Sequence, residues 1–121
     1  MSMTIGTDIV SIHRFHEFAQ DTNHPVLKKI FTQNELDYCF AKDAVEPHLA
    51  ARFAGKEATI KALYSRGISD VWYTDIEILN RHDGVPFVKL KKEMYKDLKL
   101  EISLAHCEDK ALAFVVILGD D

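Results

Sequence analysis

One segment near the middle of the chain has the apolar spacing of a long helix, and a carboxylate falls on its apolar face. Leu49, Phe53, Ile60 and Tyr64 recur at helical spacing, and Glu57 fills the missing step of that stripe. A carboxylate on a buried face is costly unless a cation or hydrogen bonds compensate it. The helix therefore predicts either a half-buried ion pair or a functional acid at this position.

The two interpretations of Glu57 assign different roles to Lys61, one helical turn further on. Side chains four residues apart on a helix are neighbours, so Lys61 can form an ion pair with Glu57 that merely supports the helix. Lys61 can equally share an anion or a metal ion with Glu57. This segment alone leaves both interpretations open.

Two more polar side chains lie on predicted strands. Residues 4–10 are rich in β-branched side chains and read as a short strand, with Asp8 embedded in it. His106 ends an alternating strand over 100–106. Taken alone, Asp8 is more often a turn or N-cap acid, and a histidine at a strand end is usually a surface residue. Both are candidates only in combination with the rest of the chain.

Length and composition favour a single globular domain over 1–121. The chain has 121 residues, of which 47% are apolar and 28% charged, which argues against disorder. No apolar run approaches the roughly 20 residues of a membrane span. The first residues have neither the basic region nor the apolar core of a signal peptide, so we expect a cytoplasmic protein. Cys39 and Cys107 lack metal-like spacing, and we expect both to be free thiols.

Capping, proline and turn signals divide the remainder into short elements. Helices are predicted from Ser11 to about Gln20, over 25–30, from a capping box at 32–35 to about Lys42, from Pro47 to before Gly67, and over 91–98. Strands are predicted over 72–79, 87–90, 100–106 and 111–118, with a hairpin turn at Asp83-Gly84.

These elements indicate an α+β fold with a mainly antiparallel sheet covered by helices. We expect the first strand to join the final hairpin, which would bring Asp8 toward His106. A net charge of −4 makes nucleic-acid binding unfavourable, because phosphate contacts need a basic surface. Arg14, Lys28 and Lys29, with His13, His16 and His24 nearby, form a cationic cluster in the first half. This cluster is either a solvated helix face or a binding patch.

Four blocks of residues stand out together along this chain. They are Gly6-Thr7-Asp8-Ile9-Val10, Arg52-Phe53-Ala54-Gly55-Lys56-Glu57-Ala58 with Lys61, Asp75-Ile76-Glu77-Ile78-Leu79-Asn80 followed by Asp83-Gly84-Val85-Pro86, and Ser103-Leu104-Ala105-His106. In this order the blocks resemble the small phosphopantetheinyl transferases and, more narrowly, the holo-acyl-carrier-protein synthases, from about residue 4 to residue 117. The chain departs from the family where the usual Ser-His pair is Ala105-His106 and the usual Gly-Lys-Pro turn is Gly84-Val85-Pro86.

The resemblance implies transfer of 4'-phosphopantetheine from coenzyme A to a serine of an apo acyl carrier protein, with release of 3',5'-ADP. It implies a Mg²⁺ ion on Asp8 and Glu57, since Mg²⁺ prefers one or two carboxylates plus phosphate oxygens and water. Lys61 would neutralise pyrophosphate charge. Glu57, directly or through a metal-bound water, would be the base for the serine, with Asp8 as the second candidate.

The resemblance also implies how coenzyme A is bound. Arg52 and His106 would donate hydrogen bonds to its phosphates. Gly84 and Pro86 resemble the family's loop beside the adenine, contributed across a subunit contact. Family members of this length are typically trimers with active sites between subunits, so we expect a homotrimer.

Acyl carrier proteins are acidic, so we expect Arg14, Lys28 and Lys29 to bind the carrier. Which carrier is served, of fatty-acid, polyketide or other synthesis, stays open. One alternative is a non-catalytic coenzyme A or carrier-protein binding module. A weaker alternative is a Mg²⁺-dependent phosphohydrolase, because such enzymes usually need a richer carboxylate cluster or a nucleophile.

Overall fold

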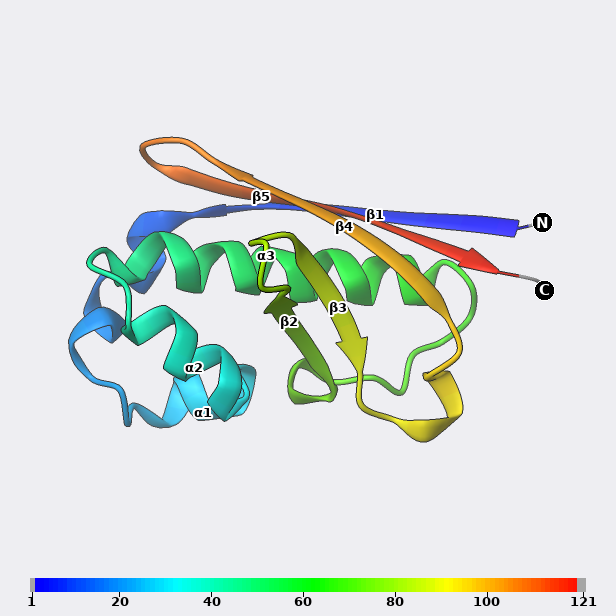
Figure 1. Ribbon diagram of the computed structural model, residues 1–121, viewed down its shortest axis with the longest axis horizontal. Coiled ribbons are helices and arrows are strands. Elements are labelled where there is room, and N and C mark those ends of the chain that lie inside the picture. The colour runs from blue at the N-terminus through cyan, green and yellow to red at the C-terminus, as the bar shows by residue number, and fades with distance from the viewer. Residues whose placement is uncertain (1, 120–121) are drawn as a thin grey trace.

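A long helix, α3 (Val45–Tyr64), crosses the middle of the molecule beneath an antiparallel sheet (Figure 1). The computed structural model describes residues 2–119, so the domain predicted over 1–121 extends past them at both ends. The sheet has the order β1 (Ser2–Ser11), β5 (Lys110–Gly119), β4 (Lys99–His106). The expected α+β fold with an antiparallel sheet and covering helices is confirmed.

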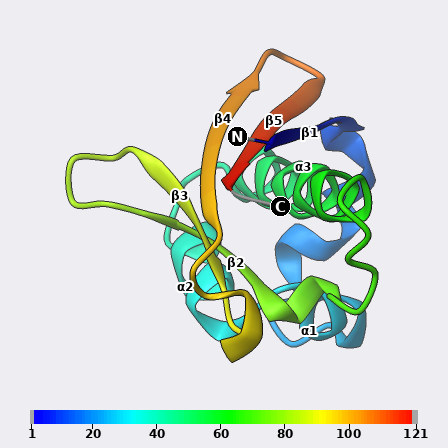
Figure 2. The ribbon, with the colours of Figure 1, turned by 90° about the vertical axis from the view of Figure 1, so that its right-hand side faces the viewer.

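Helix α3 is more deeply buried than its apolar stripe predicted. Every residue over 49–59 is buried except Glu57, which is half-buried. The cause is that α3 is covered on two sides, by the sheet on one and by helices and a hairpin on the other (Figure 2). Tyr64, predicted on the inner face, is 71% exposed because it is the last residue of the helix.

Strand β1 lies directly against α3 because one of its residues has no side chain. A Cβ at Gly6 would lie 2.0 Å from the carbonyl oxygen of Ala58 and 2.8 Å from the amide nitrogen of Ala62. Only glycine fits so close an approach of strand to helix. Asp8 is on the same face of β1 as Gly6, so this contact also carries Asp8 toward the helix.

The opposite side of α3 is covered by α2 (Gln33–Phe40) and by β2 (Ile76–Asn80), which pairs with β3 (Pro86–Leu90) in a hairpin. Helix α1 (Pro25–Ile30) packs against residues 73–75. The predicted capping box is confirmed, since Thr32 and Glu35 each bond the other's backbone amide. The predicted hairpin turn is confirmed by Gly84, whose φ of 90° favours glycine.

A buried ion pair joins these covering elements to α3. Lys56 Nζ lies 2.7 Å from Glu35 Oε1, and both side chains are fully buried. Lys56 also donates to the carbonyls of Tyr73 and Ile76, and Glu35 accepts from the amide of Ile78. Burial raises the pKa of Glu35 and lowers the pKa of Lys56, while their mutual attraction opposes both shifts. The pair fastens α2 and β2 to the same point of α3.

Glu77, beside this pair, is also buried and hydrogen-bonded. Its Oε2 accepts from the hydroxyl of Thr32 at 2.6 Å and from the side chain of Asn34 at 3.2 Å. Burial alone would raise the pKa of Glu77, but these hydrogen bonds and the charges of Lys91 and Lys89 together outweigh it and hold the pKa below the ordinary value.

The helix predicted from Ser11 to Gln20 is wrong in type. The segment forms two short 3₁₀-helices, η1 (Ile12–Phe15) and η2 (Glu17–Gln20), and Ser11 makes no side-chain cap. The packing explains the difference, because Ile12, Phe15 and Phe18 are spaced by three. A helix with three residues per turn puts all three on the side that meets the core.

Two other boundaries also differ from prediction. The strand expected from Trp72 begins at Ile76, after a 3₁₀ turn, η3 (Tyr73–Asp75), that the Asp75 carboxylate fixes by accepting from the Trp72 amide at 2.8 Å. The helix expected over 91–98 is only η4 (Glu93–Tyr95). There Lys92 and Tyr95 bond to Asp70 instead, and tertiary contacts override helix propensity.

The first strand joins the final hairpin as predicted, but its partner is β5. Asp8 lies opposite Ala113 and His106 lies opposite Ala111, so β5 separates the two strands that carry Asp8 and His106. Within residues 2–119 no helix has the length and apolar content needed to span a membrane. Cys39 and Cys107 are free thiols, as expected.

Candidate active site

Three predicted site residues come together where β1 crosses α3. Lys61 on α3 donates to Asp8 Oδ1 at 3.2 Å and to the carbonyl of Thr7 at 3.0 Å. Thr7, Asp8, Ile9, Lys61 and Leu112 line a pocket of about 270 Å³. Glu57 precedes Lys61 by one helical turn. We call Asp8, Glu57 and Lys61 the acid–lysine group.

The helical ion pair considered for Glu57 is not formed, because Lys61 pairs with Asp8. Glu57 Oε1 instead accepts a hydrogen bond of 2.6 Å from the hydroxyl of Tyr73. Burial, this hydrogen bond and the negative charges of Glu57 and Asp8 raise the pKa of Tyr73 to about 12. The phenol is therefore a protonated donor at neutral pH. The negative charges of Glu57 and Asp8 both favour this protonated form of the hydroxyl.

The acid–lysine group fits a Mg²⁺ ion that is shared with a phosphate. It offers two carboxylates, which matches the number that Mg²⁺ commonly takes from protein when phosphate oxygens and water complete its shell. Among residues 2–119, no set of three or more His, Cys, Asp or Glu side chains is placed to hold a metal. The donors thus suit an ion brought with a phosphorylated ligand, rather than a cage made by protein alone.

Positive side chains gather at the other end of α3, around the ring of Tyr38. Arg52 Cζ lies 4.0 Å and Lys42 Nζ 4.5 Å from the centre of that ring, and the ring of His48 lies 5.8 Å from it. Burial and the charges of Arg52, Lys42 and His106 lower the pKa of His48. We call Lys42, His48, Arg52 and His106 the cationic corner, and its excess positive charge suits an anion.

The cationic corner adjoins the β2–β3 hairpin. Arg52 is almost fully buried and its guanidinium donates to the side chain of Asn80, which in turn donates to the carbonyl of Gly84 at 2.9 Å. Asn80 is also the ladder partner of Pro86. The pocket here, of about 390 Å³, is lined by Asn34, Tyr38, Arg52, Ile78, Leu79, Asn80, Arg81 and Phe87. It combines aromatic walls with two guanidinium groups.

The acid–lysine group and the cationic corner face different directions within one chain. Arg52 and Lys61 are nine residues apart on α3, which places them roughly 14 Å apart along the axis and about 180° around it. The structure thus brings together Asp8, Glu57 and Lys61, and separately Arg52 and His106 with the hairpin.

The sequence analysis missed Lys42, His48 and Tyr38 as members of the cationic corner, and Tyr73 as the partner of Glu57. One signal was present, since His48 and Arg52 are four residues apart and share a helix face. For Tyr73 no local pattern pointed to Glu57, because the contact joins segments sixteen residues apart.

The predicted carrier-binding residues lie on η1 and α1. Arg14 is exposed on η1, with its guanidinium carbon 5.3 Å from the centre of the Phe53 ring. Its positive charge opposes the rise in the pKa of Tyr73, so it borders the acid–lysine group. Lys28 and Lys29 are exposed in the last turn of α1.

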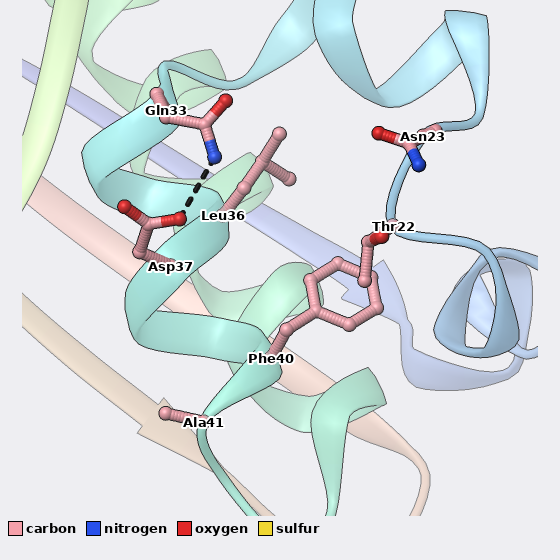
Figure 3. A pocket seen from close by; sticks show the side chains of 7 residues that line it. All are labelled: Thr22, Asn23, Gln33, Leu36, Asp37, Phe40 and Ala41. Atoms are coloured by element: carbon pink, nitrogen blue, oxygen red, sulfur yellow. Dashed lines mark hydrogen bonds between the residues drawn. The ribbon is translucent and has the colours of Figure 1, made fainter.

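A larger pocket, of about 410 Å³, opens between α2 and the segment before α1 (Figure 3). Gln33 donates to Asp37 across one wall at 2.8 Å, and Leu36 and Phe40 supply apolar surface. Its lining contains a carboxylate and no cation, and none of the predicted site residues. A pyrophosphate would be repelled here, so this pocket is not the candidate active site.

Comparison with known proteins gives one consistent match. A family model described as the 4'-phosphopantetheinyl transferase superfamily matches residues 4–115. The holo-[acyl-carrier-protein] synthase of Protochlamydia amoebophila is 39% identical over 122 residues, covering 96% of this chain and 98% of that protein. An ACPS–CoA complex from Chronobacterium ammoniagenes superposes with a TM-score of 0.83 at 27% identity, covering 100% of both chains. A holo-(acyl-carrier-protein) synthase from Bacillus anthracis in complex with CoA (3',5'-ADP) has a TM-score of 0.77 at 28% identity, covering 96% of this chain and 97% of that one.

Proposed function

Because the chain belongs to the 4'-phosphopantetheinyl transferase superfamily, among its holo-[acyl-carrier-protein] synthases, we propose that it transfers 4'-phosphopantetheine from coenzyme A to a serine of an apo acyl carrier protein. We further propose that the reaction depends on Mg²⁺ and releases 3',5'-ADP. The observation that carries the proposal is the acid–lysine group, in which Lys61 reaches from α3 to Asp8 on β1 beside Glu57.

The chemistry requires a base and a cation at the acid–lysine group. The serine oxygen forms a bond to the phosphorus next to pantetheine, and the bridging P–O bond of the pyrophosphate breaks with its electron pair leaving on 3',5'-ADP. We assign the serine proton to the Glu57 carboxylate, which it reaches directly or through a water. Asp8 is the second candidate, because its Oδ1 already accepts from Lys61. The Lys61 ammonium stabilises charge developing on the phosphates.

Asp8 and Glu57 would hold the Mg²⁺ ion. When bound, the ion supplies Lewis acidity toward the pyrophosphate oxygens. This use would account for a carboxylate and a lysine that line one pocket between β1 and α3, with a second carboxylate one turn away on α3. Gly6 allows strand and helix to meet there.

The cationic corner and the hairpin pocket suit the nucleotide end of coenzyme A. Arg52 and His106 would bind phosphate oxygens, with Lys42 adding positive charge. Gly84 and Pro86 lie at the hairpin turn, where we place the adenine. Because the corner and the acid–lysine group face different ways, one coenzyme A would reach both only between two subunits.

The sheet supplies a surface for such an assembly. Its face turned away from α3 is uncovered in Figure 1. Met3, Ile5 and Ile9 on that face are 55–62% exposed, and Leu112 and Phe114 on β5 continue it. An exposed apolar patch of this kind commonly marks an interface between subunits. We propose that three copies meet through this face in a homotrimer, with the active sites between them.

The acidic carrier would approach the edge where Arg14 borders the acid–lysine group. Lys28 and Lys29 on α1 would add attraction at longer range. Because Arg14 is both exposed and close to the reacting groups, it is the residue through which docking and chemistry would meet.

One experiment tests the activity. The purified protein is incubated with apo acyl carrier protein, coenzyme A and Mg²⁺, and the carrier is weighed intact by mass spectrometry. Addition of one phosphopantetheine arm is expected. An unchanged carrier with coenzyme A bound would instead favour a binding module, and coenzyme A breakdown without carrier modification would favour a phosphohydrolase.

A further inference from the structure

Tyr73 contacts two consecutive residues of α3 through different atoms. Its backbone carbonyl accepts from Lys56 Nζ at 2.8 Å, and its hydroxyl donates to Glu57 Oε1 at 2.6 Å. Lys56 belongs to the fully buried ion pair with Glu35, whereas Glu57 belongs to the acid–lysine group. One residue therefore connects the buried ion pair to the candidate active site.

The position of the Tyr73 hydroxyl is fixed by packing as well as by these bonds. The centre of its ring lies 5.7 Å from that of Phe53 on α3 and 4.9 Å from that of Trp72. The 3₁₀ turn that carries it is closed by Asp75, which accepts from the Trp72 amide. The ring cannot turn away without losing these contacts, so the hydroxyl is a rigid donor.

The hydrogen bond from Tyr73 leaves half of the Glu57 carboxylate free. Oε1 is engaged, and within residues 2–119 Glu57 has no further hydrogen-bond or ion-pair partner. A donor on one oxygen restricts rotation of the carboxylate and leaves the lone pairs of the other oxygen for a ligand. Removing a group that orients a metal-binding side chain in this way commonly weakens metal binding.

We propose that Tyr73 is a positioning residue for Glu57, holding its carboxylate so that the second oxygen is presented to the divalent ion. This inference rests on the proposed function, because it takes Glu57 as a ligand of that ion. The inference gives η3, which is neither part of β1 nor part of α3, a direct role in arranging the site.

The test compares Tyr73→Phe with Tyr95→Phe. Each substitution removes one phenol that donates to a carboxylate, but Tyr95, on η4, donates to Asp70, which is apart from the acid–lysine group. The measured quantity is Mn²⁺ binding by electron paramagnetic resonance, with coenzyme A present and no carrier, because oxygen sites for Mg²⁺ also accept Mn²⁺. We expect Tyr73→Phe to weaken Mn²⁺ binding about tenfold and Tyr95→Phe to leave it unchanged.

A double-mutant cycle separates positioning from a general structural role. If Tyr73 acts through Glu57, adding Tyr73→Phe to Glu57→Gln should lower neither the residual Mn²⁺ affinity nor kcat further. In the parent protein, which keeps Glu57, Tyr73→Phe should lower kcat while the KM for the carrier stays unchanged. Working at low temperature keeps both variants folded, and melting curves check this.

Two outcomes overturn the inference in distinguishable ways. Parental Mn²⁺ binding and kcat in Tyr73→Phe, with both reduced in Glu57→Gln, would remove Tyr73 from the site and leave the proposed function intact. Equal Mn²⁺ binding by the parent and by Glu57→Gln would remove Glu57 as a ligand, and with it both the metal assignment and the inference.

Discussion

Adding one methyl group at Gly6 should separate β1 from α3 and so disable the site. In Gly6→Ala, the new Cβ would lie 2.0 Å from the carbonyl oxygen of Ala58, whereas ordinary contact begins at 3.4 Å. Strand and helix must therefore move apart by about 1.4 Å, the difference between these distances. The obstacle is backbone on both sides, so no side chain can rotate to relieve it.

Two effects of different size follow from this displacement. Overpacking of this kind costs about 1–3 kcal/mol of stability, which for a chain of 121 residues corresponds to a fall in melting temperature of roughly 5–15 °C. The rate should suffer more, because Asp8 moves with β1 while Lys61 and Glu57 stay on α3. A misplacement of about 1 Å commonly costs about a hundredfold in rate. The protein should thus remain folded at 20 °C and lose most of its transfer activity.

The assay is the mass shift of the carrier, timed at 20 °C alongside thermal unfolding followed by circular dichroism. The matched control is Gly119→Ala on β5, whose Cβ would meet, among residues 2–119, only the flexible side chain of Arg66, at 3.4 Å. We expect near-parental stability and rate in the control. If Gly6→Ala also keeps the parental rate, then close approach of β1 to α3 does not build the site, and the reasoning is refuted.

Four further expectations concern single groups. Glu57→Gln should lower Mg²⁺-dependent transfer about a thousandfold without changing the melting temperature, and near-normal turnover would contradict the metal assignment. Arg14→Glu should raise KM for the carrier but not for coenzyme A, less so at high salt; equal weakening toward both would point to a folding defect. His106→Ala should weaken coenzyme A binding at least about tenfold with little change in kcat, and unchanged affinity by calorimetry would make His106 a surface residue only. Glu77, whose folded pKa lies below its ordinary 4.5, contributes stability that is present above pH 4.5 and lost as pH falls through the folded value; urea midpoints of the parent and Glu77→Gln should therefore converge in acid, and a constant gap would contradict this.

Elements specified by their own residues could be predicted from the sequence. The capping box before α2 and the turn at Gly84 depend on bonds and φ angles within a few residues, and both formed as expected. The helix predictions over 11–20 and 91–98 were wrong because contacts with distant residues determine the conformation of these segments. Phe15 packs on Phe31 and Phe53 across the core, and Lys92 bonds to Asp70, and neither contact has a local sequence signal.

The site shows the same division. Asp8, Glu57 and Lys61 were predicted together, and the structure brings them together at one crossing. A second charge on α3, Lys56, was not predicted to be buried, because the groups that compensate it, Glu35 and the carbonyls of Tyr73 and Ile76, come from other elements. Glu35, the ion-pair partner of Lys56, lies on another helix, so the burial of Lys56 could not be inferred from spacing along α3.

The acid–lysine group has a consequence for how activity is lost on heating. It lies on α3, which is covered on two sides, and on β1, which pairs with β5 along its whole length. Segments of this kind open only together with the core, whereas sites on loops can melt first. Warming should therefore not melt the acid–lysine group before the core of the subunit. Folded but inactive molecules should appear only where the proposed trimer has dissociated.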